Sequence, residues 1–297
     1  MSKLWWASAI GLTLCAGSDA SALQPGGWSN QLGSQLDWKH PPSVPGYATP
    51  FGDAPRGSVW MQPARRKGAP LVLWIGGYAV SQKSSLSEIW MPSRFFEEGY
   101  AYGAISHGQP PGTDFARIRA SLIEGLRTAV KLAEKEGADT RRLILIGDED
   151  GAQLAALIAT DPSWLAEAGI DFGRVKAALL FEGRLFDVAS GLGRQSAQNA
   201  ASLKRTLGED PALYARLSPA AQLTPPNAPL FILAVPRDRE TAAESEDFAR
   251  TLAAAGVAAR TVTMPKSRGE ALTTLPGAPA HRETKQVMTL LAGAVGG

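Results

Sequence analysis

Residues 143–157, LILIGDEDGAQLAAL, run from an apolar segment through two glycines into a segment rich in Ala and Leu. The apolar half is typical of a buried β-strand and the second half of a buried helix. Gly147 and Gly151 lie on either side of three acidic residues, with Glu149 at their centre. The pattern predicts a strand, a tight turn at Glu149 and a helix that follows at once.

The same alternation of strand and helix extends to both sides of this stretch. Strands are predicted at residues 58–63, 70–78, 99–106, 175–183, 229–238 and 259–265, and helices at 87–98, 117–136 and 243–255. Alternating strands and helices predict an α/β protein with a mostly parallel central sheet and helices on both faces. Residues 58–297 are assigned to this one domain, and residues 23–57, rich in Gly, Pro, Ser and Trp, to a leader.

The composition limits the possible functions. The chain has 297 residues, a formal net charge of +2 and a hydrophobic share of 44%, so it can bury one substantial core. The nearly balanced charge provides no basic stripe for nucleic acid. The single cysteine, Cys15, lies near the amino terminus, so disulfides, thiolate metal sites and a cysteine nucleophile are not expected in the rest of the chain.

The amino-terminal residues have the pattern of a cleaved secretory signal. Lys3 precedes an apolar run over residues 4–16, and Ala20-Ser21-Ala22 provides small residues for cleavage after Ala22. The apolar run is too short to span a bilayer comfortably, and no other run approaches that length. We therefore expect a periplasmic or secreted protein without a membrane span.

Three motifs follow the ends of predicted strands. Gly147-x-x-x-Gly151 matches the frame of a nucleophile elbow, Gly-x-Ser-x-Gly, with Glu149 at the nucleophile position. Residues 74–78, WIGGY, hold two glycines where a His-Gly-Gly loop would provide backbone amides to an oxyanion. Asp238 ends a later apolar strand, in the chain order nucleophile, acid, base.

With these motifs the chain resembles the α/β-hydrolases, in particular the esterase/lipase group of carboxylesterases and feruloyl-esterase-like proteins. The resemblance covers about residues 58–291 and includes GDEDGAQLAAL, SPAAQL (218–223) and AAAGVAARTVTMP (253–265). It implies the α/β-hydrolase fold. It also implies an elbow framed by Gly147 and Gly151, and an oxyanion site formed around Gly76, Gly77 and Asp150.

The catalytic residues of that group are not all in place. Glu149 stands where the resemblance requires the nucleophilic serine, and Gly269 stands about where it requires the catalytic histidine. An acid such as Asp238 then has no histidine to orient. The leading interpretation is a non-catalytic, esterase-like protein that binds a small ligand or a partner in the former cleft.

An active hydrolase is the alternative. A carboxylate on the elbow can form an ester intermediate, as in haloalkane dehalogenases and epoxide hydrolases, but that scheme also requires a histidine. The candidate set is Glu149 with Asp238 and either His281 or His107. His281 also fits the first turn of a helix and His107 a loop. A Ser/Lys dyad of Lys83 with one of the nearby serines is a weaker alternative; these serines are Ser81, Ser84 and Ser85.

Other sites are not predicted. The acidic residues 148–150 could attract a cation, but side chains diverge on a sharp turn and no further ligand is evident. Asp148 and Asp150 instead fit the amino-terminal end of the following helix, where negative charge is favourable. No metal, cofactor or protein partner is identified. Trp74, Trp90 and Trp164 fit either a pocket wall or ordinary packing.

Overall fold

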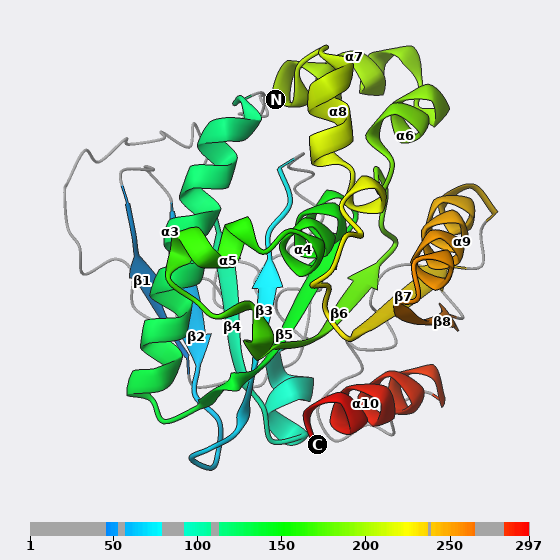
Figure 1. Cartoon of the computed structure of the whole chain (residues 1–297). Helices are drawn as coiled ribbons and strands as arrows, with labels where there is room; N and C mark the ends of the chain where they lie inside the picture. The colour runs from blue at the N-terminus through cyan, green and yellow to red at the C-terminus, as the bar shows by residue number, and fades with distance from the viewer. Residues whose placement is uncertain are drawn as a thin grey trace, which may run out of the picture.

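One eight-stranded sheet organises the chain, in the order β1-β2-β4-β3-β5-β6-β7-β8 (Figure 1). The computed structural model describes residues 46–52, 57–78, 92–107, 113–236, 239–264 and 282–296. The pairs β1/β2 and β2/β4 are antiparallel, and the six strands from β4 to β8 are parallel. The strands are β1 (Tyr47–Pro50), β2 (Ser58–Gln62), β3 (Pro70–Ile75), β4 (Ala101–Ser106), β5 (Asp139–Asp148), β6 (Val175–Phe181), β7 (Leu230–Pro236) and β8 (Ala258–Met264).

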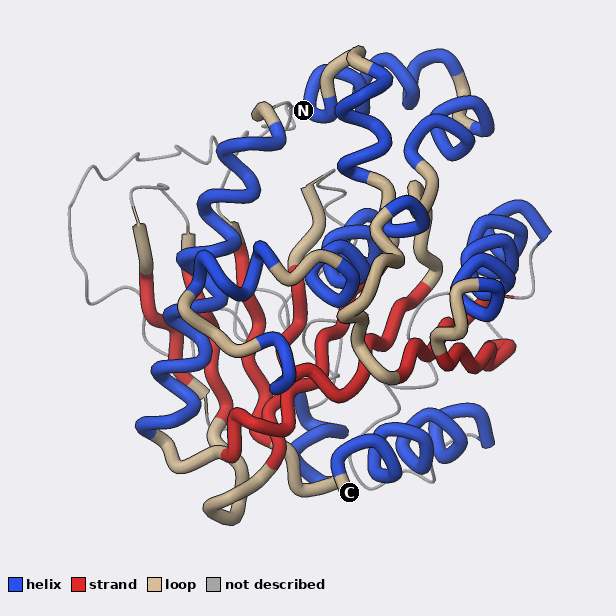
Figure 2. The backbone as a smooth tube through the Cα atoms, in the orientation of Figure 1, coloured by secondary structure: helices blue, strands red, loops and turns tan. Residues whose placement is uncertain are grey.

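Helices cover both faces of the sheet (Figures 1 and 2). One face carries α3 (Phe115–Lys135), α4 (Asp150–Thr160), α5 (Ser163–Ala168) and α9 (Arg239–Ala254). The other carries a short helix at residues 92–97 and α10 (Arg282–Val295). The sheet is therefore the middle of three layers, as the alternation of strands and helices predicts.

The central strands are apolar throughout because both of their faces are covered. In β3, Leu71, Leu73 and Ile75 pack toward α3 and α4, whereas Val72 and Trp74 pack toward the face of α10. All five are at most 3% exposed. The edge strand β8 is exposed over much of its length, and only from Thr261 to Met264 do exposed and buried residues alternate. Such continuous and alternating patterns are typical of central and edge strands, respectively.

The long helix α3 shows how local sequence sets an element's ends. Asp114 precedes the helix, and its carboxylate accepts a hydrogen bond from the backbone N–H of Arg117 at 3.1 Å. Gly137 follows it with a φ of 86°, a conformation that glycine adopts without strain. The helix thus begins two residues before the predicted start at residue 117, because the cap at Asp114 satisfies a free amide.

Two regions contain more regular structure than the sequence predicts. Strand β1 lies within the range assigned to the leader and pairs with β2 at the edge of the sheet. Residues 184–226, interpreted as irregular, contain α6 (Val188–Arg194), α7 (Ala197–Leu207) and α8 (Pro211–Leu217), with 3-10 turn η3 (Pro219–Ala221). A second 3-10 turn, η2 (Phe172–Arg174), precedes β6. In Figure 1, α6, α7 and α8 lie together beyond the end to which β3 and β6 point.

Helix length and polarity also bear on membranes. Within the ranges described above, the helices fall short of the length and apolar character needed to cross a bilayer.

Candidate functional site

The turn between β5 and α4 has the strained backbone of a nucleophile elbow. Glu149, which is half-buried, has φ 52° and ψ −114°, a combination that a residue with a side chain rarely adopts. Its backbone N–H donates to the carbonyl oxygen of Phe181 on the neighbouring strand at 3.0 Å. Such strained turns display the central residue at the carboxyl edge of the sheet. Here that residue is a glutamate.

The two glycines of the elbow lie where no side chain fits. A Cβ atom built on Gly147 would be 2.1 Å from the carbonyl oxygen of Gly151, and one built on Gly151 would be 2.6 Å from the carbonyl oxygen of Ile75. Both obstacles are backbone atoms, which cannot rotate away as a side chain can. The start of α4 therefore rests directly on the ends of β5 and β3.

The loop after β3 meets the elbow through Asp150. The Asp150 carboxylate accepts a hydrogen bond from the backbone N–H of Tyr78. A Cβ atom built on Gly77 would lie 2.6–2.7 Å from the same carboxylate, so only glycine fits there. Gly76 anchors the loop by donating its N–H to the carbonyl oxygen of Ile105 at 3.0 Å. An acidic side chain thus accepts a hydrogen bond from an amide of the loop after β3, the loop that provides N–H donors to the oxyanion in α/β-hydrolase esterases.

The side chain of Tyr78 extends this contact into the core. Its hydroxyl donates to Oε1 of Gln153, and Nε2 of Gln153 donates to the carbonyl oxygen of Leu217 at 2.8 Å. Burial, with the nearby charge of Asp150, holds the pKa of Tyr78 well above its ordinary value. Tyr78 therefore stays protonated at neutral pH and acts as a hydrogen-bond donor. The network ties the glycine loop to α4 and to the end of α8.

His107 follows β4 and supports the same loop. Its Nε2 donates to the carbonyl oxygen of Gly77 at 2.9 Å, and its own carbonyl oxygen accepts from the hydroxyl of Ser121 at 2.6 Å. Burial lowers the pKa of His107, and the hydrogen bond to Gly77 partly opposes that shift. The ring is therefore mostly neutral at neutral pH, with the proton of Nε2 directed at a backbone carbonyl. Nε2 holds the glycine loop in place.

A second acidic residue, Glu182, follows the strand next to the elbow. It is buried, has a φ of 44° and donates its N–H to the carbonyl oxygen of Ala234 at 3.1 Å. Phe181 pairs with Asp148 on one side and with Ala234 on the other, so Glu149 and Glu182 leave adjacent strands at the same edge. Glu182 was not among the site residues predicted from the sequence, although it stands at the end of a predicted strand, where ligands of parallel sheets bind.

Several predicted site residues lie outside the described ranges. They are Asp238, Gly269 and His281, together with the proposed dyad residues Ser81, Lys83, Ser84 and Ser85, and also Trp90. The catalytic assignments that depend on them remain predictions. Within the described part of the chain, the structure brings together Glu149, Asp150, the glycine loop and His107.

The two described tryptophans of the sequence analysis belong to the core. Trp74 is 3% exposed and Trp164 is 2% exposed. Trp164 packs edge-to-face against Phe115, with ring centroids 6.2 Å apart, and the guanidinium of Arg119 lies 5.0 Å from the centroid of its ring. Their positions are explained by packing.

The described site combines two acidic side chains with the amino-terminal end of α4. An ester reaction requires N–H donors aimed at the oxygen that becomes negative in the transition state. Here the N–H of Tyr78 is directed at the carboxylate of Asp150, and a second carboxyl group, Glu149, stands at the elbow.

Comparisons with known proteins agree on the architecture. No protein-family model and no curated protein matches the sequence. Among solved structures, esterase B from Lactobacillus rhamnosis has a TM-score of 0.70 and 18% identity, over 91% of this chain and 93% of that one. Esterase LipW from Mycobacterium marinum has a TM-score of 0.66 and 21% identity, over 93% and 88%. A fungal esterase from Rhizomucor miehei has a TM-score of 0.67 and 15% identity, over 96% and 93%.

These similarities extend over nearly the whole chain, at identities that establish the fold and not the activity. The parallel sheet, the elbow after β5 and the glycine loop after β3 are the parts that an esterase scaffold requires. The chain has the α/β-hydrolase fold, in the form found in these esterases.

Proposed function

We propose that this protein is an exported, esterase-like α/β-hydrolase-fold protein that does not turn over esters and instead binds a small ligand or a partner at the former catalytic cleft. The hydrogen bond from the Tyr78 N–H to the Asp150 carboxylate carries this proposal. In this arrangement, an internal anion already holds an amide that catalysis would direct at the substrate.

Two features of the sequence support the same conclusion. Glu149 stands in place of the nucleophilic serine. The site therefore lacks the hydroxyl group that a general base would deprotonate to attack an ester. Gly269 stands where the resemblance requires a histidine. Removal of nucleophile and base from a triad leaves only residual catalysis, roughly 10³–10⁴-fold over water in a well-studied protease. Such a rate is too low for ordinary ester turnover.

Export is the second part of the proposal and rests on the first 22 residues. Lys3, the apolar run that follows and Ala20-Ser21-Ala22 fit a cleaved secretory signal. Expression of the full chain in a Gram-negative host, followed by amino-terminal sequencing of the periplasmic fraction, tests it. We expect the mature chain to begin at Leu23. Retention of the intact amino terminus in the cytoplasm would contradict export.

The activity test uses the purified mature chain with short-chain p-nitrophenyl esters and a feruloyl ester. We expect the wild-type rate to equal that of Glu149→Gln and to lie near the rate in buffer. Catalysis by the wild type that disappears in Glu149→Gln would contradict the proposal and favour the active hydrolase.

A gain-of-function series isolates the contribution of Asp150. The double variant Glu149→Ser, Gly269→His restores the two missing residue types but keeps the Asp150 carboxylate on the loop. We expect little activity until Asp150→Ala is added, because only then is the N–H of Tyr78 free for an oxyanion. An active double variant that gains nothing from Asp150→Ala would show that Asp150 does not block the site.

One observation favours the active alternative. The φ of Glu149 is 52°, and non-glycine residues in such conformations, which typically cost about 1–3 kcal/mol, are often found at functional sites. The alternative uses Glu149 with Asp238 and either His281 or His107. For His107, the proton on Nε2 is already donated to Gly77, so only the other ring nitrogen could act as a base.

A further inference from the structure

The two sides of the β1–β2 pair differ in what covers them. On one side Tyr47 packs toward α3, and its hydroxyl donates to Oε1 of Glu136 at the end of that helix at 2.9 Å. On the other side α10 packs against β5 to β8, at the opposite end of the sheet from β1 (Figure 1). The short helix at residues 92–97 reaches β4, where Phe95 stacks on Tyr102 with ring centroids 5.8 Å apart. The described helices on this side therefore lie over β4 to β8.

The rest of this side, over β1 and β2, is uncharged and partly apolar. Trp60 stands at its centre, is half-buried and meets Tyr102 edge-to-face at a centroid distance of 6.2 Å. Ala48 on β1 and Ala104 on β4 lie directly across the strands from Trp60, and both are half-buried. Apolar surface of this kind is typical of a place where another segment packs. We call it the β1–β2 face; its residues are Gly46, Ala48, Trp60, Gln62 and Ala104.

The described chain before β1 begins on this face. The ring of Trp60 lies over the backbone of Gly46, because a Cβ atom built on Gly46 would be only 2.2 Å from Cζ2 of that ring. A side chain at residue 46 would therefore displace the tryptophan. Tyr47 pairs with Met61, so Gly46 comes next to Gln62 on β2. The residues that precede Gly46 thus start at the β1–β2 face.

Gln62 is an independent sign that this face has a further partner. Its side chain is fully buried, yet neither Oε1 nor Nε2 has a hydrogen bond within the part of the chain that the structure describes. Buried polar atoms of this kind nearly always have a partner. A peptide group offers one N–H and one carbonyl oxygen, which are the donor and acceptor that this amide lacks.

The composition of residues 23–45 fits such a partner. Only Asp37 and Lys39 carry a formal charge in this segment, and their charges are opposite. Segments that stay without a packing surface are usually rich in charge and poor in aromatic residues. The large apolar residues here are Leu23, Trp28, Leu32, Leu36, Trp38 and Val44. Two tryptophans in so short a segment favour a packed position.

We propose that residues 23–45 dock on the β1–β2 face of the same chain. Tryptophan and leucine side chains of the segment pack on Trp60, Ala48 and Ala104, and a peptide group bonds to the amide of Gln62. The β1–β2 face does not include the elbow, so this proposal is independent of the function proposed there.

The covalent connection at Gly46 favours this segment over a second molecule. Docking of a tethered segment is intramolecular, and short flexible tethers give effective concentrations of about millimolar. Length is sufficient as well. The step from β1 to β4 is two strand spacings, about 10 Å, whereas ten extended residues reach about 33 Å.

Disulfide trapping in the chain that begins at Leu23 tests the docking. That chain has no cysteine, because Cys15 precedes it. Leu36→Cys is combined either with Ala48→Cys, on the β1–β2 face, or with Thr49→Cys, the next residue, whose side chain is on the α3 side. The series is repeated with Leu32→Cys and with Trp28→Cys. We expect at least one leader position to form an intramolecular disulfide with Ala48→Cys about ten times faster than with Thr49→Cys.

The adjacent positions 48 and 49 make this comparison strict, since both are almost equally far along the chain from the leader cysteine. Equal rates at the two positions for all three leader cysteines would overturn the proposal, because a leader that does not dock meets both sides by chance. Disulfides that join two molecules would place the leader on a second copy and overturn it as well.

Alkylation of Ala48→Cys by iodoacetamide detects docking without a cross-link. Leu32→Asp with Leu36→Asp puts charges on apolar positions of the leader, and we expect the alkylation rate to rise at least tenfold because charges are costly to bury. The matched control, Gln31→Asp with Gln35→Asp, adds the same charges one residue earlier and should leave the rate unchanged. Thr49→Cys should keep its rate in both backgrounds, which separates undocking from unfolding. No acceleration by the leucine variants, or an equal acceleration by the control, would contradict docking.

Discussion

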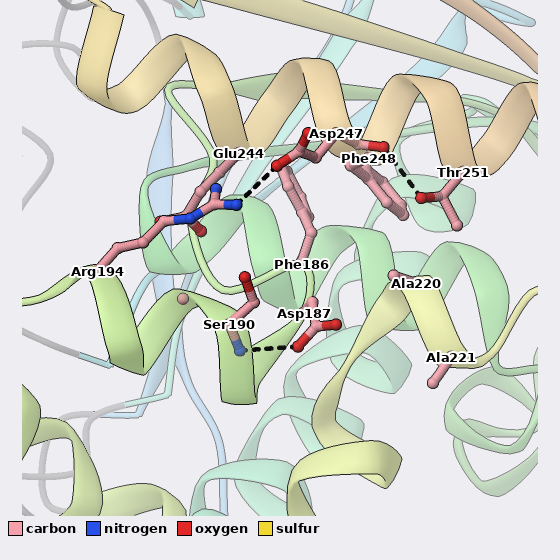
Figure 3. Close-up of a pocket in the computed structure, with 11 residues that line it drawn as sticks. Phe186, Asp187, Ser190, Arg194, Ala220, Ala221, Glu244, Asp247, Phe248 and Thr251 are labelled. Carbon is pink, nitrogen blue, oxygen red and sulfur yellow. Dashed lines mark hydrogen bonds and ion pairs between the residues drawn. The ribbon is translucent and has the colours of Figure 1, made fainter.

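The elbow between β5 and α4 and the turn between β6 and α6 are both held by a buried carboxylate that accepts a backbone N–H. At the elbow, Asp150 binds the N–H of Tyr78 and fills the space next to Gly77. At the turn, Glu244 binds the N–H of Leu185 and is one of the residues that line a cavity (Figure 3). The same type of contact therefore occupies an amide of the glycine loop in one region and holds a turn with a positive φ, at Leu185, in the other.

The difference arises from what surrounds each carboxylate. Asp150 is packed against backbone on the loop side, where Gly77 leaves no room for a further atom. Glu244 also contacts backbone, at the N–H of Leu185, but it lies on the side of α9 that lines a cavity of about 290 Å³. At the elbow, the glycines bring backbone directly against backbone, which makes a rigid contact. Between α6 and α9, side chains separate the helices, and such a gap can enclose a ligand.

The largest expected effect tests the rigidity of the elbow. Gly147→Ala places a Cβ 2.1 Å from a backbone carbonyl oxygen, and we expect it to lower the free energy of unfolding by at least about 3 kcal/mol. Gly191→Ala, beside the cavity, meets the Cδ2 methyl group of Leu185 at 2.7 Å and its Cα at 3.1 Å. The methyl group can move and the Cα is less close than the obstacle at Gly147, so we expect a smaller loss of about 1 kcal/mol. Urea denaturation followed by tryptophan fluorescence measures both.

The control for these two variants is Gly293→Ala, at an open and exposed position of α10, where nothing lies within 4 Å of the added Cβ. We expect it to stabilise the protein by about 0.5–1 kcal/mol, because alanine favours helix. Equal losses in Gly147→Ala and Gly191→Ala would show that the two regions do not differ in rigidity.

The second expected effect concerns the carboxylate of the elbow. Asp150→Ala leaves the N–H of Tyr78 without its acceptor in a buried place, and we expect a loss of about 1–3 kcal/mol in the free energy of unfolding. Asp150→Asn retains an acceptor and should lose less. The same denaturation measurement compares them. A loss in Asp150→Asn as large as in Asp150→Ala would mean that the charge, and not the hydrogen bond, holds the loop.

The smallest expected effect concerns Glu244 and pH. Its pKa in the folded protein is raised by burial, so its contribution to stability is greatest below the unfolded pKa and is lost as the pH rises through the folded pKa. The groups that face it are Arg194 on α6, Asp187 just before α6, Arg184 on the turn and Asp247 on α9.

Thermal unfolding between pH 4 and pH 8 measures this effect. We expect the stability of the wild type relative to Glu244→Gln to be highest at pH 4 and to fall toward pH 8. Glu246→Gln, which is exposed on the same helix, should follow the wild type at every pH. A difference between the wild type and Glu244→Gln that rises with pH would mean that the protein already compensates this carboxylate fully.

The layers of the fold were predictable because they depend on local patterns. The apolar run that became β3 and the run from Leu143 to Gly147 are buried on both faces, so their sequences contain no alternation to misread. The helices α6, α7 and α8 were missed because few of their residues are buried, and because α6 and α8 are only seven residues long. Short helices are stabilised by the tertiary contacts of a few residues more than by their own periodicity.

The sequence by itself determined the strand–turn–helix frame around Glu149. The glycines permit the tight turn and the apolar runs favour the buried strand and helix, and both effects depend only on residues close together in the chain. Only the tertiary structure decided what the acidic residues do. Asp150 reaches a backbone amide 72 positions away, and Glu244 one that is 59 positions away. Contacts of this range depend on which strands become neighbours, and no local pattern in the chain specifies them.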